Sequence, residues 1–232
     1  MYFLIADIVL VLLCVPVFMF VTECLLGLSI KMKPQDRTLP EDLRTCILIP
    51  AHNEQEVIID TLLSVKEQLS PNDNVVVVAD NCTDKTAAIV REFGFTALER
   101  VNDNERGKGY ALDCGITYLK QQSKRPNIVI VIDADCLLGD KALLHLKQAV
   151  IHQQAPAQAC YLMRRGEVDR IAVKVSEFAF MVKNKIRLQG LSRLGMPVPL
   201  TGTGMAFPFE SLEKVNLATG DIVEDMRLGV EL

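Results

Sequence analysis

The sequence has no tryptophan, no paired cysteine motif and no excess of positive charge. Its seven cysteines include no C-x-x-C pair and fall mostly in apolar runs. Neither a zinc site nor a disulfide framework is therefore expected, and a reducing compartment fits better. There are 25 Lys and Arg residues against 29 Asp and Glu residues, for a formal net charge of −4. Nucleic-acid-binding proteins usually carry a basic face, so we expect no nucleic-acid partner.

Two common phosphate-binding motifs are absent as well. The G-x-x-x-x-G-K-[ST] spacing of a Walker loop does not occur. No G-x-G-x-x-G links the first predicted strand to the first helix, which disfavours a dinucleotide-binding Rossmann fold. The three histidines lack the spacing of metal ligands. Half of the 232 residues are hydrophobic, which is enough to bury one substantial core.

Residues 2–30 are almost wholly apolar and are interrupted only by Asp7 and Glu23. The uncharged part, residues 8–22, is too short to span a bilayer, which needs about 20 helical residues. Extended to residue 30, the segment from residue 8 reaches about 34 Å at 1.5 Å per residue, which is sufficient. We expect a transmembrane anchor over residues 1–30, and a buried hairpin of helices is the alternative.

The charges around this segment predict its orientation. Lys31 and Lys33 follow it, and the positive-inside rule then places the downstream domain in the cytoplasm. No positive charge precedes it and no A-x-A-like site follows, which argues against a signal peptide. We expect a single-pass protein of the cell membrane, with a linker over residues 31–44. Glu23 would cost roughly a few kcal/mol in the membrane unless it snorkels or faces a partner helix.

From Thr45 onwards, short apolar runs alternate with helical patterns. Strands are expected at residues 46–49, 74–79, 96–101, 127–132 and 157–163, and helices at residues 54–69, 84–93, 109–122 and 140–153. A long, weakly amphipathic helix is expected over residues 167–194, and a strand or extended loop over residues 200–207. This alternation predicts an α/β fold with a mostly parallel sheet flanked by helices.

Polar motifs follow three of the predicted strands: Pro50-Ala51-His52-Asn53-Glu54, Asp80-Asn81-Cys82-Thr83-Asp84 and Asp133-Ala134-Asp135. In a parallel sheet these loops leave one edge and can converge on one ligand. Paired carboxylates suit Mg²⁺ or Mn²⁺ bound together with substrate phosphates. Each motif also has a local explanation, because Asp and Asn are favoured in strand-end turns and at helix N-caps.

Three further motifs are candidates for binding or catalysis. Arg106-Gly107-Lys108-Gly109 offers positive charge and free N–H groups at a predicted helix start, where a phosphate can bind; an ordinary flexible loop is the alternative. Thr201-Gly202-Thr203-Gly204 would let the backbone pass close to a ligand. Glu224-Asp225 either caps a helix or removes a proton from a hydroxyl nucleophile.

Taken together and in this order, these motifs resemble family 2 glycosyltransferases with the nucleotide-sugar-binding GT-A fold. The resemblance covers residues 45–232, which it identifies as the catalytic domain. With the membrane anchor, the chain is most similar to the polysaccharide-synthase-like branch. The resemblance implies transfer of a sugar from a nucleotide-sugar donor, with UDP the commonest donor nucleotide, to a hydroxyl of a glycan or lipid-linked acceptor. It also implies a Mg²⁺ or Mn²⁺ cofactor.

The resemblance also implies roles for individual residues. The donor nucleoside would contact Ala51, Asn53, Glu54 and Asp80. Lys108 would lie near the base or diphosphate, Asp133 would face the donor, and Asp135 would ligate the metal. Thr201, Gly202, Thr203 and Gly204 would shape the acceptor side. Asp225 would be the general base, supported by Glu224, and would give one in-line displacement with inversion at the anomeric carbon.

The sequence departs from this branch after the acidic pair. Members continue into a Q/R-x-x-R-W motif and further membrane helices, whereas this chain has no tryptophan and reaches Leu232 within a predicted helix. We therefore expect a C-terminally incomplete catalytic domain. One alternative is a truncated, non-catalytic fragment that binds a sugar nucleotide or associates with a membrane. Another is a nucleotidyltransferase, which shares the α/β form and the acidic metal ligands.

Overall fold

The computed structural model describes residues 2–29, 38–163, 170–215, 217–218 and 229. The chain divides into two compact units. One unit is formed by residues 1–33 and 160–199, and its described elements are helices. The other, formed by residues 34–159 and 200–232, contains the sheet.

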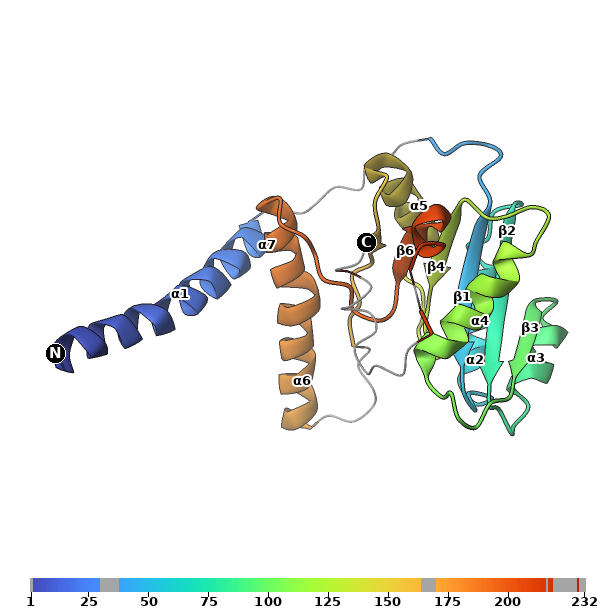
Figure 1. Cartoon of the computed structure of the whole chain (residues 1–232), viewed down its shortest axis with the longest axis horizontal. Coiled ribbons are helices and arrows are strands. Elements are labelled where there is room, and N and C mark those ends of the chain that lie inside the picture. The colour runs from blue at the N-terminus through green and yellow to red at the C-terminus, as the bar shows by residue number, and fades with distance from the viewer. Residues whose placement is uncertain (1, 30–37, 164–169, 216, 219–228, 230–232) are drawn as a thin grey trace. The chain divides into compact units, whose positions relative to one another are not determined.

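The sheet has six strands in the order β3-β2-β1-β4-β6-β5. Their bounds are β1 Thr45–Ala51, β2 Asp73–Asp80, β3 Thr96–Arg100, β4 Ile128–Val131, β5 Ala157–Gln158 and β6 Met205–Pro208. The pairs within β3-β2-β1-β4 are parallel, while β6 runs antiparallel to both β4 and β5. The prediction of a mostly parallel sheet is confirmed (Figure 1).

The strands β1, β2 and β4 are buried on both faces because apolar, often β-branched residues occupy every position of their centres. Along β1, Ile47 and Ile49 belong to one core cluster, whereas Leu48 belongs to the other. The first cluster packs against helices α2 (Ile58–Lys66), α3 (Thr86–Glu92) and α5 (Ala142–Gln153). The second packs against α4 (Lys108–Lys120) and α8 (Phe209–Leu212). Helices thus cover both faces of the sheet.

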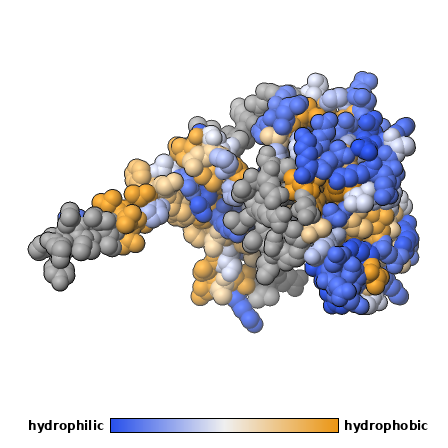
Figure 2. Space-filling view, in the orientation of Figure 1, coloured by the Kyte–Doolittle hydropathy of each residue, from blue (hydrophilic) through white to orange (hydrophobic). Residues whose placement is uncertain are grey.

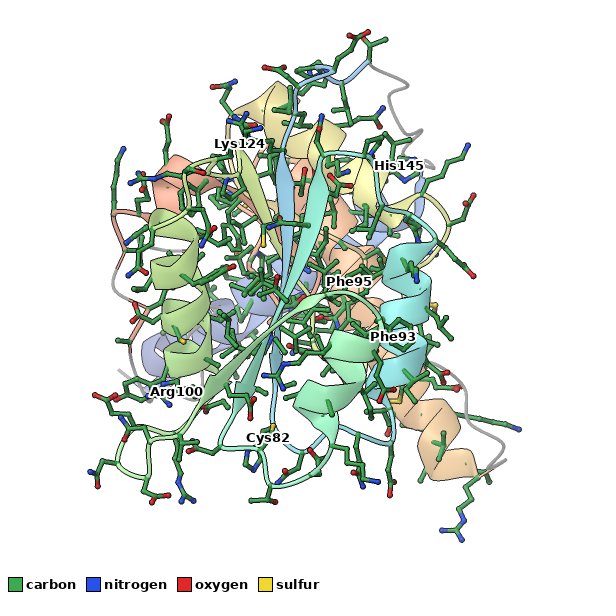
Figure 3. The ribbon with its side chains drawn as sticks, turned by 90° about the vertical axis from the view of Figure 1, so that its right-hand side faces the viewer. Cys82, Phe93, Phe95, Arg100, Lys124 and His145 are labelled. Atoms are coloured by element: carbon green, nitrogen blue, oxygen red, sulfur yellow. The ribbon has the colours of Figure 1, made fainter. Side chains whose placement is uncertain are left out.

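The parallel strands bring their carboxyl ends to one edge of the sheet. Figure 3 shows Cys82, which follows β2, and Arg100, the last residue of β3, at this edge, with Lys124 and His145 toward the opposite end. The strand expected over residues 157–163 is shorter than predicted. After β5, the Ala159 N–H still donates to the Gly204 carbonyl at 2.8 Å, but from Cys160 the chain belongs to the helical unit.

The helical unit contains α1 (Tyr2–Ser29), α6 (Ile171–Met181), the π-helical segment η1 (Val182–Arg187) and α7 (Leu188–Arg193). The last three replace the single helix expected over residues 167–194, whose first residues, 167–169, lie outside the described part of the chain. Within α1, Leu10–Leu28 is long and apolar enough to cross a membrane. Glu23 does face a partner helix, because Arg187 Nε donates to Glu23 Oε2 at 2.7 Å.

Candidate functional site

A cavity of about 480 Å³ opens at the carboxyl edge of the parallel strands. It is formed by the loops after β1, β2 and β4 and by the start of α4. The lining residues are Pro50, Ala51, His52, Glu54, Asp80, Asn81, Arg106, Gly107, Lys108, Ala111, Asp133, Ala134 and Asp135. The three polar strand-end motifs predicted from the sequence therefore converge on one cavity.

An asparagine in the left-handed conformation turns the chain at the end of each of two strands. Asn53 has φ 55° after β1, and Asn81 has φ 51° after β2, a conformation that Asn tolerates better than most residues. The Asn53 Oδ1 accepts a hydrogen bond from the Thr83 N–H at 2.8 Å, which ties the first loop to the second. The Asn81 Oδ1 accepts from the Asn102 N–H at 2.8 Å. These bonds tie the first loop to the second, and the second loop to the segment after β3.

Asp84 also joins the loop after β1 to the loop after β2. Its carboxylate accepts from the Gln55 N–H at 3.0 Å and from the Thr86 N–H at 2.9 Å. Thr86 in turn accepts the Glu54 N–H at 2.9 Å. Burial raises the pKa of Asp84, but the hydrogen bonds from Thr86 and Gln55 outweigh it and hold this pKa below its ordinary value. Asp84 thus accepts the first N–H of α3, although Lys85 is the N-cap residue of that helix.

Asp80 forms a shielded ion pair in the wall of the cavity. Arg100 Nη1 donates to Asp80 Oδ1 at 2.8 Å, and the two side chains are only 13% and 9% exposed. The guanidinium of Arg100 also lies 5.4 Å from the ring centroid of Tyr110. Burial lowers the pKa of Arg100, but the hydrogen bond and charge of Asp80 and the charge of Glu105 together outweigh burial, so the net shift of this pKa is upward. The pair fixes the Asp80 carboxylate at the edge of the cavity.

The carboxylates after β4 form a group that can hold a metal ion. One ligand atom from each of Asp133, Asp135 and Cys136 lies within 4.8 Å of the others. The Asp133 N–H donates to Thr203 Oγ1 at 2.9 Å, which fixes the backbone beneath the pair. Hard cations such as Mg²⁺ and Mn²⁺ prefer oxygen ligands, so the two carboxylates fit such an ion.

The thiol of Cys136, beside Asp133 and Asp135, offers sulfur rather than oxygen to a metal ion. Burial first, and then the charges of Asp133 and Asp135, raise the pKa of Cys136 to about 11. Hard cations such as Mg²⁺ and Mn²⁺ prefer oxygen to sulfur ligands, so the two carboxylates fit such an ion better than the thiol does.

Lys108 connects the acidic pair to the loop before β6. Its ammonium group contacts Asp133 Oδ1 and the Gly202 carbonyl. It stands at the first position of α4, after Gly107, whose φ of 125° suits glycine.

Glu54, which also lines the cavity, lies near several other acidic groups. Burial raises the pKa of Glu54, and the charges of Asp135, Asp84 and Asp133 add to this effect. Lys108 is thus a cation facing a concentration of acidic groups.

The cavity brings together most, but not all, of the predicted site residues. Those that line it are Ala51, Glu54, Asp80, Lys108, Asp133 and Asp135. Asn53 is outside the lining, because its side chain bonds to Thr83. Thr203 and Gly202 contact Asp133 and Lys108, and the Thr201 N–H donates to Gln158 Oε1 at 2.9 Å. The Gly204 carbonyl accepts from Ala159. Asp225 and Glu224 lie outside the described residues.

Sequence reasoning gave no individual role to several residues that the structure places at the site, although three of them stand in motifs that it singled out. His52, Asn81, Arg106 and Ala111 line the cavity, and Arg100 holds Asp80. His52 Nδ1 lies 2.7 Å from the Asp80 carbonyl oxygen. His52, Asn81 and Arg106 stand inside the recognised motifs, so their position was a usable signal. Arg100 is the last residue of β3, a strand that carries no motif.

Solved structures that align with this chain include proteins determined with nucleotide sugars. A mannosyltransferase of Pyrobaculum calidifontis, solved with GDP-Man and Mn²⁺, aligns with a TM-score of 0.59 at 20% identity, covering 92% of this chain and 60% of that one. Staphylococcus aureus TarS, solved with UDP-GlcNAc, aligns with a TM-score of 0.57 at 14% identity, covering 82% and 53%. At these identities the likeness establishes the GT-A fold alone.

Sequence relatives extend the comparison over shorter stretches. The 4,4'-diaponeurosporenoate glycosyltransferase of Staphylococcus aureus is 36% identical over 92 residues, which are 38% of this chain and 23% of that protein. The chain thus matches about a quarter of the length of this relative. The model of the family described as Glycosyl transferase family 2 matches residues 46–215, which include every strand of the sheet except the first residue of β1. On this match, the chain belongs to glycosyl transferase family 2.

Proposed function

We propose that the protein transfers a sugar from a nucleoside-diphosphate sugar to a hydroxyl group of a glycan or lipid-linked acceptor. The donor is expected to be a UDP sugar, and the transfer is expected to be assisted by a divalent cation. One observation carries the proposal: three strand-end loops and the start of α4 place Asp80, Lys108 and the Asp133–Asp135 pair around one cavity.

The cavity offers complementary groups to each part of such a donor. Ala51, Glu54 and the fixed carboxylate of Asp80 line the part proposed for the nucleoside. When a donor binds, the Lys108 ammonium group would exchange part of its interaction with Asp133 for one with the diphosphate, because charge-assisted hydrogen bonds to phosphate are strong. Asp133 would then face the donor. Asn53, which sequence reasoning placed on the nucleoside, would act through the loop that it holds.

Asp135 is the proposed metal ligand, with Asp133 beside it. Neighbouring structures of this fold hold Mn²⁺, and the two carboxylates of this chain suit Mg²⁺ equally. Such an ion, when bound, would neutralise the negative charge that builds up on the departing nucleoside diphosphate. Asp135 is exposed, so it can bind an ion together with a donor that enters from solvent.

Asp225 is the proposed general base, supported by Glu224. It would accept the proton of the acceptor hydroxyl while that oxygen attacks the anomeric carbon, and the diphosphate would leave from the opposite face. One displacement inverts the configuration and forms no covalent glycosyl-enzyme. The loop of Thr201, Gly202, Thr203 and Gly204, which contacts Asp133 and Lys108, is proposed to shape the acceptor side.

The place of action is proposed to be the cytoplasmic face of a cell membrane. One helix, with the stretch Leu10–Leu28, is apolar and long enough to cross a bilayer, and Lys31 and Lys33 follow it. A positive charge on this side favours retention in the cytoplasm. A membrane-bound catalytic domain and a lipid-linked acceptor would diffuse in the same membrane, which would favour their encounter.

The test is to incubate the full chain in lipid vesicles with UDP-glucose, UDP-GlcNAc or GDP-mannose and to measure nucleoside diphosphate release. Release should require Mg²⁺ or Mn²⁺, stop with EDTA and be lost in Asp135→Asn. Asp140→Asn, an exposed carboxylate outside the cavity lining, is the matched control and should behave as wild type. Binding of a donor without turnover would favour a non-catalytic, sugar-nucleotide-binding protein. Pyrophosphate release from a nucleoside triphosphate and a sugar phosphate would favour a nucleotidyltransferase.

A further inference from the structure

The two aspartates of the proposed cation site stand in a stretch of chain that belongs to no helix or strand. It covers residues 133–141, between β4 and α5. One hydrogen bond within it joins the Cys136 N–H to the Asp133 carbonyl at 3.2 Å. The regular bonds of a helix or sheet do not hold such a segment, so its shape depends on partners elsewhere in the fold. Metal ligands bind well only when they are held in place, so these partners bear on the affinity of the site.

Thr61 of α2 holds the backbone between the two aspartates. Its Oγ1 donates to the Ala134 carbonyl at 2.7 Å, and the peptide group with this carbonyl leads directly into Asp135. Thr61 is 0% and Ala134 is 4% exposed, so solvent water does not compete for this bond. Among the residues that the structure describes, no second hydrogen-bond donor reaches the Ala134 carbonyl. Without the hydroxyl, a buried carbonyl would lack a donor, and this unfavourable state would favour a shift of the segment.

Two further polar side chains continue this contact along the segment. The Ser64 Oγ accepts a hydrogen bond from the Leu138 N–H at 3.2 Å. Gln68, just after the end of α2, donates through Nε2 to the Gly139 carbonyl at 2.9 Å. Thr61, Ser64 and Gln68 have the i, i+3, i+7 spacing of one helix face. We call these three residues the α2 row.

Helix α2 is a firm support for the α2 row, because its apolar side is fully buried. Ile58, Leu62 and Val65 are each 0% exposed. They belong to the same core cluster as Ile132 and Ala134, which flank and join the aspartates. A helix packed in this way cannot shift without disrupting a close-packed core. The α2 row therefore passes the fixed position of the helix to the segment that carries the aspartates.

We propose that Thr61 is a positioning residue of the cation site, which fixes the peptide group that leads into Asp135. Being fully buried, it touches neither the ion nor the donor and acts through the backbone alone. Ser64 and Gln68 support the same segment farther from the aspartates. The inference rests on the proposed function, because it requires that Asp135 holds the cation. Groups that hold metal ligands from outside commonly contribute about 10- to 100-fold to metal affinity.

The test compares variants that separate the positioning of the aspartates from the stability of the fold. Thr61→Val removes the hydroxyl and keeps a β-branched side chain, whereas Thr61→Ser keeps the hydroxyl. Thr45→Val is the matched control, because Thr45 is also 0% exposed and its Oγ1 has no hydrogen-bond partner within the described part of the chain. Ser70→Ala controls for lost stability, because the Ser70 Oγ accepts from Lys147 Nζ at 3.2 Å and neither residue lines the cavity.

Figure 2 shows hydrophobic residues gathered over the described part of α1, so the full chain is kept in detergent micelles throughout. Mn²⁺ binding is measured by electron paramagnetic resonance of the free ion, with and without UDP, well below the Tm of every variant in EDTA. Thr61→Val should bind Mn²⁺ about 10- to 100-fold more weakly than wild type. Ser64→Ala should lose less affinity, because its bond lies farther from the aspartates. Thr61→Ser, Thr45→Val and Ser70→Ala should bind Mn²⁺ as wild type does, whatever their Tm.

Each outcome supports or overturns the role of Thr61. Wild-type Mn²⁺ affinity in a folded Thr61→Val with a lowered Tm would make the hydroxyl merely structural and overturn the proposal. An equal loss of affinity in Ser70→Ala would do the same, because affinity would then follow stability. If Thr61→Val does not fold, Ser64→Ala decides: weaker Mn²⁺ binding supports the proposal, and wild-type binding overturns it. No Mn²⁺ binding by wild type, with or without UDP, would refute the cation site itself and this inference with it.

Discussion

Replacing Lys108 with methionine should change the affinities for metal and donor in opposite directions. The lysine pairs with Asp133 in the unliganded protein, so it competes with a cation for that carboxylate. When a donor is bound, the proposed partner of the same lysine is the diphosphate. Methionine keeps the length and the packing of the aliphatic stem but removes the charge.

The structure sets the size of both effects. Two unit charges 4 Å apart interact by about 1 kcal/mol in water and about 4 kcal/mol at an effective dielectric of 20. The Lys108 and Asp133 side chains are 23% and 36% exposed, so we take the lower part of this range, about 1–2 kcal/mol. Metal alone should then bind about 5- to 25-fold more tightly to Lys108→Met. A charged hydrogen bond is worth about 1.5–3 kcal/mol, so the donor should bind about 10- to 140-fold more weakly.

Isothermal titration of the full chain measures both quantities, first with Mn²⁺ alone and then with UDP-glucose at saturating Mn²⁺. Lys120→Met is the control, because Lys120 lies at the other end of the same helix and its loss changes the net charge equally. Lys120→Met should change neither affinity. If metal and donor affinities of Lys108→Met fell together, or if neither changed, the proposed exchange of Lys108 between Asp133 and the diphosphate would be refuted.

Three other substitutions test separate parts of the account. Asp225→Asn should keep donor binding and lose transfer, measured as glycoside formation; retained transfer would exclude Asp225 as the base. Cys136→Ser should leave metal-dependent donor binding within about twofold, a change below roughly 0.5 kcal/mol, because hard cations such as Mg²⁺ and Mn²⁺ prefer oxygen to sulfur ligands; loss of metal binding would make the sulfur a ligand. Burial, followed by the charge of Asp135, raises the pKa of Glu54, so its ionised form destabilises the fold above its unfolded pKa of about 4.3. That penalty is relieved as the pH falls through the raised pKa. Glu54→Gln should therefore increase the Tm of the metal-free protein at pH 7 and reduce the gain in Tm on mild acidification, measured by thermal unfolding. An unchanged Tm would contradict this reasoning.

The central strands and the clustering of their loops were predictable from the sequence. The runs over residues 75–78 and 128–132 consist almost entirely of Val and Ile, which predicts strands buried on both faces. Once parallel strands are predicted, the motifs at Asp80 and Asp133 must emerge at the same edge. This topological rule located most of the cavity without any knowledge of the contacts.

The contacts that refine the site come from residues distant in sequence. Arg100 pairs with Asp80 across 20 positions, and no local pattern links the two. The bond between the Thr83 N–H and Asn53 Oδ1 joins residues 30 positions apart, and no local pattern links these two either. The antiparallel direction of β6 is likewise fixed by its long-range pairing with β4.

In the helical unit, too, the local sequence predicted the helices but not the contacts between residues distant in sequence. The apolar pattern predicted a helix in the part of the chain where the structure has α1 (Tyr2–Ser29). The partner of Glu23 could not be predicted, because Arg187 is 164 positions away. A weakly amphipathic helix was predicted over residues 167–194. Its π-helical turn at η1 and its attachment to α1 could not be predicted, because both depend on packing.

The central claim is that this cavity binds a nucleoside-diphosphate sugar through a divalent cation held by Asp135. The most direct measurement is calorimetric titration of UDP-glucose and GDP-mannose into the full chain, with Mn²⁺ or with EDTA, for wild type and Asp135→Asn. The account predicts binding of at least one donor that requires Mn²⁺ in the wild type and is lost in Asp135→Asn. Equal binding by the two proteins, or binding by wild type that persists unchanged in EDTA, would contradict it.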